Sequence, residues 1–240
     1  MEAAAEVWED IIKDQGFGLL VIDYGYAEGT NGLANAVVTQ TLLGRPSAAR
    51  LLVDTIEEDG DELPWYFDPD PLANTHWHMR SALAKDLSIA ESSTRFRFDP
   101  PEQLEVSYRG EARESAPQEV KDNYDLFTSV LHEMGHCLGM AKSYNGAVTE
   151  VADGDYDLHE IVSNELGTDW AALIHDGKAG HLEWGPGKTN NPLMCGDCAE
   201  SGVRRLPSAL DALAVSQAGG WTEINLPQKE YSGHMVEPSF

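Results

Sequence analysis

The segment from His132 to Gly139 contains the residues whose types and spacing most directly indicate chemistry. It reads His132-Glu133-Met134-Gly135-His136-Cys137-Leu138-Gly139. On a helix, two histidines four positions apart lie on one face, about one turn from each other, so both imidazoles can bind one metal ion. Glu133 lies between them in sequence and can reach a water molecule bound to that ion. The spacing favours a zinc site over a surface helix that has two histidines by chance.

The residues around this motif predict the helix that it requires. Apolar residues recur at helical spacing from about Asp122 to Leu138, and we expect Asp122 or Asn123 to cap the first turn. Gly139 follows at a point where a residue with positive φ can end the helix and turn the chain sharply. A later segment can then return beneath the metal. It must supply a further ligand, because zinc sites use at least three protein side chains.

Composition limits the classes of partner. The chain has 240 residues, with 16 basic and 41 acidic side chains and a net charge of −25. Because this charge repels phosphate backbones and anionic lipids, we expect no nucleic acid and no membrane as partners. No apolar run is long enough to span a bilayer. The first residues lack the basic and apolar regions of a signal peptide, so the protein is either cytosolic or a secreted protein whose leader is absent from this chain.

Hydrophobic periodicity predicts helices and strands that alternate before the motif helix. No linker or repeat divides the sequence, which indicates one domain over residues 1–240. Expected helices cover residues 3–13, 76–85, 157–166 and 207–217. Expected strands cover residues 17–24, with both faces buried, 48–56, 95–98 and 104–108, whereas residues 32–43 fit either a helix or a strand.

Several motifs together resemble the metzincin zinc metallopeptidases. These are the motif from His132 to Gly139, the later turn Asn191-Pro192-Leu193-Met194, and a closing helix from Pro207 that leads to Gly219-Gly220-Trp221. The segments Asp125-Leu126-Phe127 and Trp65-Tyr66-Phe67-Asp68-Pro69 are similar to bacterial matrixin-like members. The resemblance covers roughly residues 17–221 and is strongest at the motif. It implies an α+β fold with a twisted mixed sheet and helices in an upper subdomain, about 1–140, and a small irregular lower subdomain, about 141–240. Substrate would lie in the cleft between them.

The third ligand departs from the usual pattern of this family. It normally follows the motif glycine by three residues, where this chain has Lys142. A cationic lysine is repelled by zinc and is a poor ligand at neutral pH. Leishmanolysin-like members insert a long segment before a third histidine, which a tryptophan and the methionine turn then follow. His181, with Trp184 and Met194 after it, resembles this arrangement, so we predict His181 as the third ligand. His159 and His175 are weaker candidates, and an altered site with Lys142 in place of a ligand is the alternative.

The resemblance implies peptide-bond hydrolysis at a zinc ion (Zn2+). His132, His136 and His181 would bind the metal, Glu133 would take a proton from a bound water and pass it to the leaving amine, and Met194 would lie under the metal. We therefore predict a secreted, extracellular zinc endopeptidase whose partner is a protein or peptide substrate. Because of Lys142, a catalytically inactive zinc-binding interaction module is the alternative.

Three cysteines and an acidic segment leave further questions open. Cys195 and Cys198 have the C-x-x-C spacing but no second pair to complete a four-thiolate zinc site. We expect a structural disulfide rather than redox chemistry, with Cys137 as one candidate partner. Residues 153–157 alternate carboxylates as calcium loops do, yet lack the Gly and Glu of an EF-hand, so Ca2+ binding and a solvated loop are both open. His76 and His78 fit either a second metal site or two surface histidines.

Overall fold

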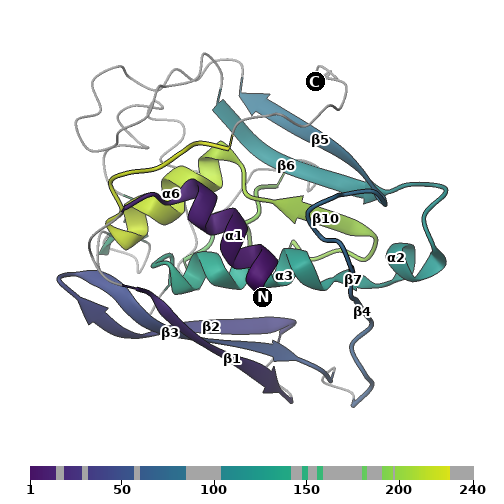
Figure 1. Ribbon diagram of the computed structural model, residues 1–240, viewed down its shortest axis with the longest axis horizontal. Helices are drawn as coiled ribbons and strands as arrows, with labels where there is room; N and C mark the ends of the chain where they lie inside the picture. Colours follow the sequence, from purple (N-terminus) through teal and green to yellow (C-terminus); the bar gives the residue numbers. More distant parts are fainter. Residues whose placement is uncertain are drawn as a thin grey trace.

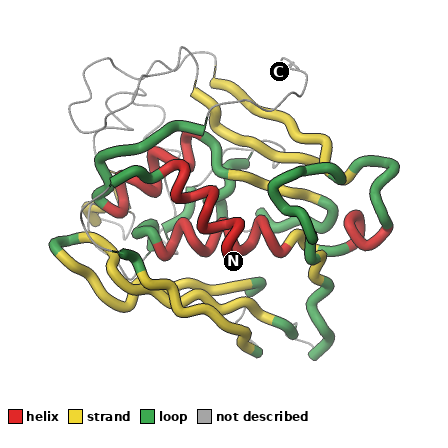
Figure 2. Tube along the Cα trace, in the orientation of Figure 1, coloured by secondary structure: helices red, strands yellow, loops and turns green. Residues whose placement is uncertain are grey.

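The computed structural model describes residues 1–14, 19–28, 32–56, 60–84, 104–141, 148–150, 156–158, 180–182, 191–196 and 198–227. These residues form an α+β fold, with the longer helices between sheets (Figure 1). The helices are α1 (Glu2–Ile11), α2 (Gln118–Asp122), α3 (Leu126–Cys137) and α6 (Ala209–Gly219). In Figure 2, α3 lies between two sheets, and contacts of α3 with β2, β3 and β10 agree with this view.

The first sheet contains β1 (Val21–Ala27), β2 (Ala34–Leu42) and β3 (Arg45–Asp54) in the order β1-β3-β2. β1 is parallel and β2 antiparallel to β3, so residues 34–42 are a strand rather than a helix. The prediction that both faces of the first strand are buried is wrong, because Val21, Tyr24 and Tyr26 are exposed. The physical reason is that β1 is an edge strand, and the helices lie on only one side of this sheet (Figure 1).

The second sheet contains β5 (Trp77–Ala84), β6 (Leu104–Ala112) and β10 (Val203–Leu206), and both neighbouring pairs are antiparallel. The predicted helix at 76–85 is therefore wrong. This segment pairs with β6 along its whole length, from Trp77 opposite Ala112 to Ala84 opposite Leu104. Strand formation depends on such distant partners, which helical spacing in a single segment does not reveal.

Short strands complete the described structure. β4 (Trp65–Tyr66) is parallel to β7 (Tyr124–Asp125), and β8 (Val148–Glu150) is antiparallel to β9 (Tyr156–Leu158). The first two residues of the predicted helix 157–166 thus belong to a strand. Its remaining residues and the predicted strand 95–98 lie outside the described residues.

The start of α3 is fixed by its capping residue. The Asp125 carboxylate accepts a hydrogen bond from the Thr128 backbone N–H at 3.2 Å. Asp125 is therefore the cap, and the expectation of Asp122 or Asn123 is wrong, because the short helix α2 occupies the residues up to Asp122. One face of α3 is buried in the main core, against α1, where the Trp8 indole N–H donates to the Leu131 carbonyl at 2.9 Å.

A buried arginine joins this capped end to the second sheet. Arg204 on β10 is fully buried and contacts both oxygens of Asp125, at 2.8 and 2.9 Å, and Asp68 at 2.9 Å. Its guanidinium also lies over the rings of Trp77 and Phe127. Two carboxylates and two aromatic faces compensate the loss of hydration of this cation. The start of the motif helix is thereby held in a fixed position.

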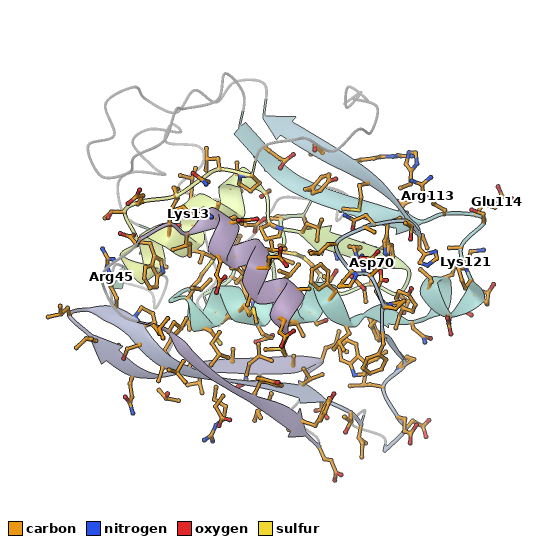
Figure 3. All side chains as sticks on the ribbon, viewed as in Figure 1. Lys13, Arg45, Asp70, Arg113, Glu114 and Lys121 are labelled. Carbon is orange, nitrogen blue, oxygen red and sulfur yellow. A yellow bond between two sulfur atoms is a disulfide. The ribbon has the colours of Figure 1, made fainter. Side chains whose placement is uncertain are left out.

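Charged side chains lie near connecting segments on both sides of the molecule. Lys13 and Arg45 lie on the side where α1 ends, and Arg113, Glu114 and Lys121 lie at the other end, beside α2 (Figure 3). The Lys121 amine donates to the Glu114 carbonyl at 2.7 Å, which holds the loop before α2.

Within the described chain, no helix is long and apolar enough to cross a membrane.

Candidate metal centre

Three histidines from two distant segments meet beside α3, where His136 is buried and His132 and His181 are partly exposed. His132 and His136 lie on α3, and His181 lies in the segment 180–182. The Nε2 atoms are 3.1 Å apart in each of the three pairs. Among the described residues, this is the one group of three or more His, Cys, Asp or Glu side chains close enough to hold a metal ion. His76 and His78 are described but form no such group, whereas Lys142, His159, His175 and Trp184 lie outside the described residues.

The hydrogen bonds of the two helix histidines fix which nitrogen faces the centre of the group. His132 Nδ1 lies 2.7 Å from the Leu193 carbonyl oxygen, and His136 Nδ1 contacts the Met140 carbonyl oxygen. A carbonyl oxygen only accepts, so each Nδ1 has the proton and each Nε2 presents a lone pair. Two such lone pairs 3.1 Å apart repel each other, and a shared cation would remove this repulsion.

The spacing and protonation of the imidazoles fit a zinc-like ion. A tetrahedral ion with metal–nitrogen bonds of about 2.0–2.1 Å separates its nitrogens by roughly 3.3 Å, close to the observed separation. Burial, together with the neighbouring His181, lowers the pKa of His132 to about 4. Burial also lowers the pKa of His136 well below its ordinary value. Both imidazoles are therefore neutral near pH 7, the form that binds a metal.

Glu133 provides a carboxyl group on the same helix. The residue is buried, and burial raises the pKa of its side chain to about 8. A cation held by the neighbouring histidines would lower this pKa again, because it stabilises the carboxylate. A carboxyl group whose pKa is near neutrality can both accept and return a proton, as a general base must.

Met194 lies against the motif helix. It is fully buried, and a Cβ atom placed on Gly135 would be only 2.3 Å from the Met194 sulfur. The thioether therefore packs on the backbone of α3 in the turn between the two histidines. Gly135 has no role among the sequence-based predictions. Gly135 lies inside a helix, where glycine lowers helix stability by about 1 kcal/mol relative to alanine. This unfavourable choice was the signal that could have indicated the close contact with Met194.

A buried carboxylate on α6 holds the methionine turn. Asp211 accepts hydrogen bonds from the backbone N–H groups of Leu193 at 3.1 Å and Met194 at 2.8 Å. It also accepts from the Ser208 N–H at 2.8 Å and hydroxyl at 2.6 Å. Because the Leu193 carbonyl contacts His132, these bonds connect α6 to the orientation of this imidazole. Asp211 was not among the predicted site residues, although the Ser208-x-x-Asp211 spacing is typical of a helix cap.

Two glycines allow the chain to turn around the histidines. Gly139 has φ of 123°, as expected for a residue that ends the motif helix, and the next residue, Met140, presents its carbonyl to His136. Gly180, directly before His181, has φ of 77°, and a Cβ atom there would lie 2.7 Å from the Met140 carbonyl oxygen. The absence of a side chain at Gly180 thus lets the segment of His181 approach the segment that orients His136.

We expect Gly180→Ala to lower zinc affinity by about 10- to 100-fold, the range typical of residues that support metal ligands. The new methyl group would displace Met140 or His181. Gly44→Ala is the matched control, because Gly44 has φ of 78° but a Cβ atom there meets nothing within 4 Å. Both variants place an alanine at nearly the same positive φ, and only Gly180→Ala should change zinc affinity in a competition titration with a chromophoric chelator. Equal zinc affinities of the two variants would contradict this role of Gly180.

The cysteine pairing is now defined. Cys195 and Cys198 form a disulfide, and Cys137 is buried on α3 and unpaired. The candidate pairing of Cys137 with one of the other two cysteines is therefore wrong. Two cysteines separated by three positions meet through a single turn of chain, whereas Cys137 faces the main core.

No family model matches this chain, and no curated protein or solved structure matches it significantly.

Proposed function

We propose that this protein is a metzincin-like zinc endopeptidase. One observation supports the proposal most directly: three imidazoles point their Nε2 atoms at one another from α3 and residue 181, with the buried carboxyl of Glu133 on the same helix. A surface helix with two histidines would require neither the third histidine nor the carbonyl partners that orient the other two.

Each residue of the site would have its own role in the reaction. His132, His136 and His181 would hold a zinc ion, which lowers the pKa of water and polarises a peptide carbonyl when it is bound in this way. Glu133 would accept the proton of the attacking water and deliver it to the leaving amine. Leu193 and Met140 would keep the two helix imidazoles in the tautomer that presents Nε2.

We expect a chelator to abolish hydrolysis of an unstructured protein substrate and added Zn2+ to restore it. Neutral imidazoles bind zinc well and Ca2+ poorly, so Ca2+ alone should not restore activity. A thermal unfolding scan of the chelated protein serves as the control that the fold persists. Full activity of the metal-free protein would refute the mechanism. Zinc binding without hydrolysis would favour the alternative function as a zinc-binding interaction module.

Several finer features of the proposal are predictions from the resemblance. These are the division into subdomains at about residue 140, a substrate cleft between them, and a protein or peptide as substrate. We also propose that the protein acts outside the cytosol. The Cys195–Cys198 disulfide supports this location, because disulfides persist in oxidising compartments. Calcium binding at residues 153–157 stays a prediction, since residues 153–155 lie outside the described residues.

A further inference from the structure

The disulfide closes a short loop immediately after the methionine turn. Cys195 directly follows Met194, and both cysteines are buried, at 4% and 9% exposure. A disulfide that closes so short a loop adds less to global stability than one that closes a long loop, because the entropy that a disulfide removes from the unfolded chain grows with the length of the closed loop. The contacts around this disulfide therefore indicate its role better than its contribution to overall stability does.

The near end of the loop contacts the third histidine. A Cβ atom placed on Gly196 would lie 3.5 Å from both Cγ and Nδ1 of His181, so the loop backbone lies against the imidazole ring. The residue after the histidine is held as well: the Leu182 N–H donates to the Met194 carbonyl at 2.7 Å, and Leu182 pairs with Cys195 in a parallel bridge. Residues 194–196 thus support both the ring of His181 and the chain next to it.

The far end of the loop is attached to the second sheet. The Cys198 carbonyl accepts a hydrogen bond from the buried guanidinium of Arg205 on β10. The Asn191 side-chain amide lies 3.1 Å from the Cys198 sulfur, and its backbone carbonyl accepts from the Ser107 hydroxyl on β6 at 2.8 Å. Contacts with two strands therefore hold Cys198 in place, and the S–S bond holds Cys195 to Cys198.

We propose that the Cys195–Cys198 disulfide positions His181, so that the metal affinity of the site depends on the oxidation state of this pair. The inference rests on the proposed zinc site. His132 and His136 are oriented by the Leu193 and Met140 carbonyls, and neither contact includes a cysteine. His181 is the histidine whose ring lies against the disulfide-closed loop. Loss of the bond frees the loop, and the expected loss of zinc affinity is about 10- to 100-fold, as for other residues that support metal ligands.

The oxidation state of the Cys195–Cys198 pair can be set without dithiols, which would compete with the protein for zinc. A water-soluble phosphine breaks the S–S bond and gives it two electrons. The two sulfurs become thiols, and water supplies the oxygen of the resulting phosphine oxide and the two protons. Glutathione disulfide reverses the change by thiol–disulfide exchange, since it is reduced to two glutathione molecules as the Cys195–Cys198 bond forms again.

The experiment measures zinc affinity by competition with a chromophoric chelator. The samples are the oxidised protein, the phosphine-reduced protein after removal of the reagent, the reoxidised protein, and a Cys195→Ser/Cys198→Ser variant. We expect weaker binding in the reduced protein and in the variant, and recovery on reoxidation, with the thermal midpoints of the metal-free proteins lowered only modestly. Cys137→Ala is the matched control: it keeps the disulfide and should show the same difference between its oxidised and reduced forms.

Three results would overturn the inference. The first is equal zinc affinity of oxidised and reduced protein. The second is a sulfur-to-cobalt charge-transfer band in the reduced protein loaded with Co2+, because the cysteines would then be ligands rather than positioning residues. The third is the absence of zinc binding from every form, which would refute the metal site as well. By contrast, a redox-dependent zinc affinity in a protein that hydrolyses nothing would support the inference and refute only the proposed enzymatic activity.

Discussion

Glu133→Gln should leave zinc binding unchanged and lower peptide hydrolysis by about 10²- to 10⁴-fold, the usual effect of removing a general base. The amide has nearly the same shape as the carboxylate, so it fits the same buried position on α3. It cannot take a proton from water, and the proposed mechanism assigns this step to no other described residue. The measurement compares turnover at saturating substrate with zinc content determined on the same sample.

Glu9→Gln is the matched control for this prediction, because Glu9 is an exposed residue of α1. The same chemical change there should leave both hydrolysis and zinc content as in the unmodified protein. If Glu133→Gln keeps more than a tenth of the original turnover with its zinc retained, Glu133 is not the general base.

His181→Ala should lower zinc affinity by several orders of magnitude, because it leaves only two imidazoles to bind the ion. The Nε2 atom of His181 lies 3.1 Å from those of both His132 and His136, so no other described histidine is in a position to replace it. Zinc affinity measured by competition titration, together with hydrolysis at saturating zinc, tests this prediction. Both should fall together.

Two variants serve as controls. His78→Ala removes an exposed histidine of β5 outside the three-histidine group, so zinc affinity should not change. Lys142→Ala should also leave zinc affinity nearly unchanged, because a cationic lysine is a poor zinc ligand. Tight zinc binding by His181→Ala would instead favour the alternative in which the site is altered and a different residue completes it.

Local sequence patterns determined the part of the site that lies on one helix. The spacing of His132, Glu133 and His136 depends only on the helical repeat. Apolar periodicity predicted a helix from about Asp122 to Leu138, and α3 covers Leu126–Cys137, so the motif is on a helix as expected although that helix begins four residues later. Gly139 was likewise predicted from its place after the helix, and its φ is positive. The α+β class was implied by the resemblance, and the described residues contain both helices and mixed sheets.

Contacts between distant segments decided the rest. Residues 77–84 have helical spacing but form a strand, because β6 lies beside them as a hydrogen-bonding partner. His181 was predicted from the resemblance, as one of several candidate histidines. Its contacts with Gly180, the methionine turn and the loop closed by Cys195 and Cys198 come from distant segments. Asp211 reaches this turn from a helix 17 or more residues later in the chain. The sequence alone determined the two helix histidines and their carboxylate, because neighbours in the chain set their relative positions. Only the tertiary structure decided what supports them, because hydrogen bonds and packing between segments far apart in sequence leave no local periodicity to detect.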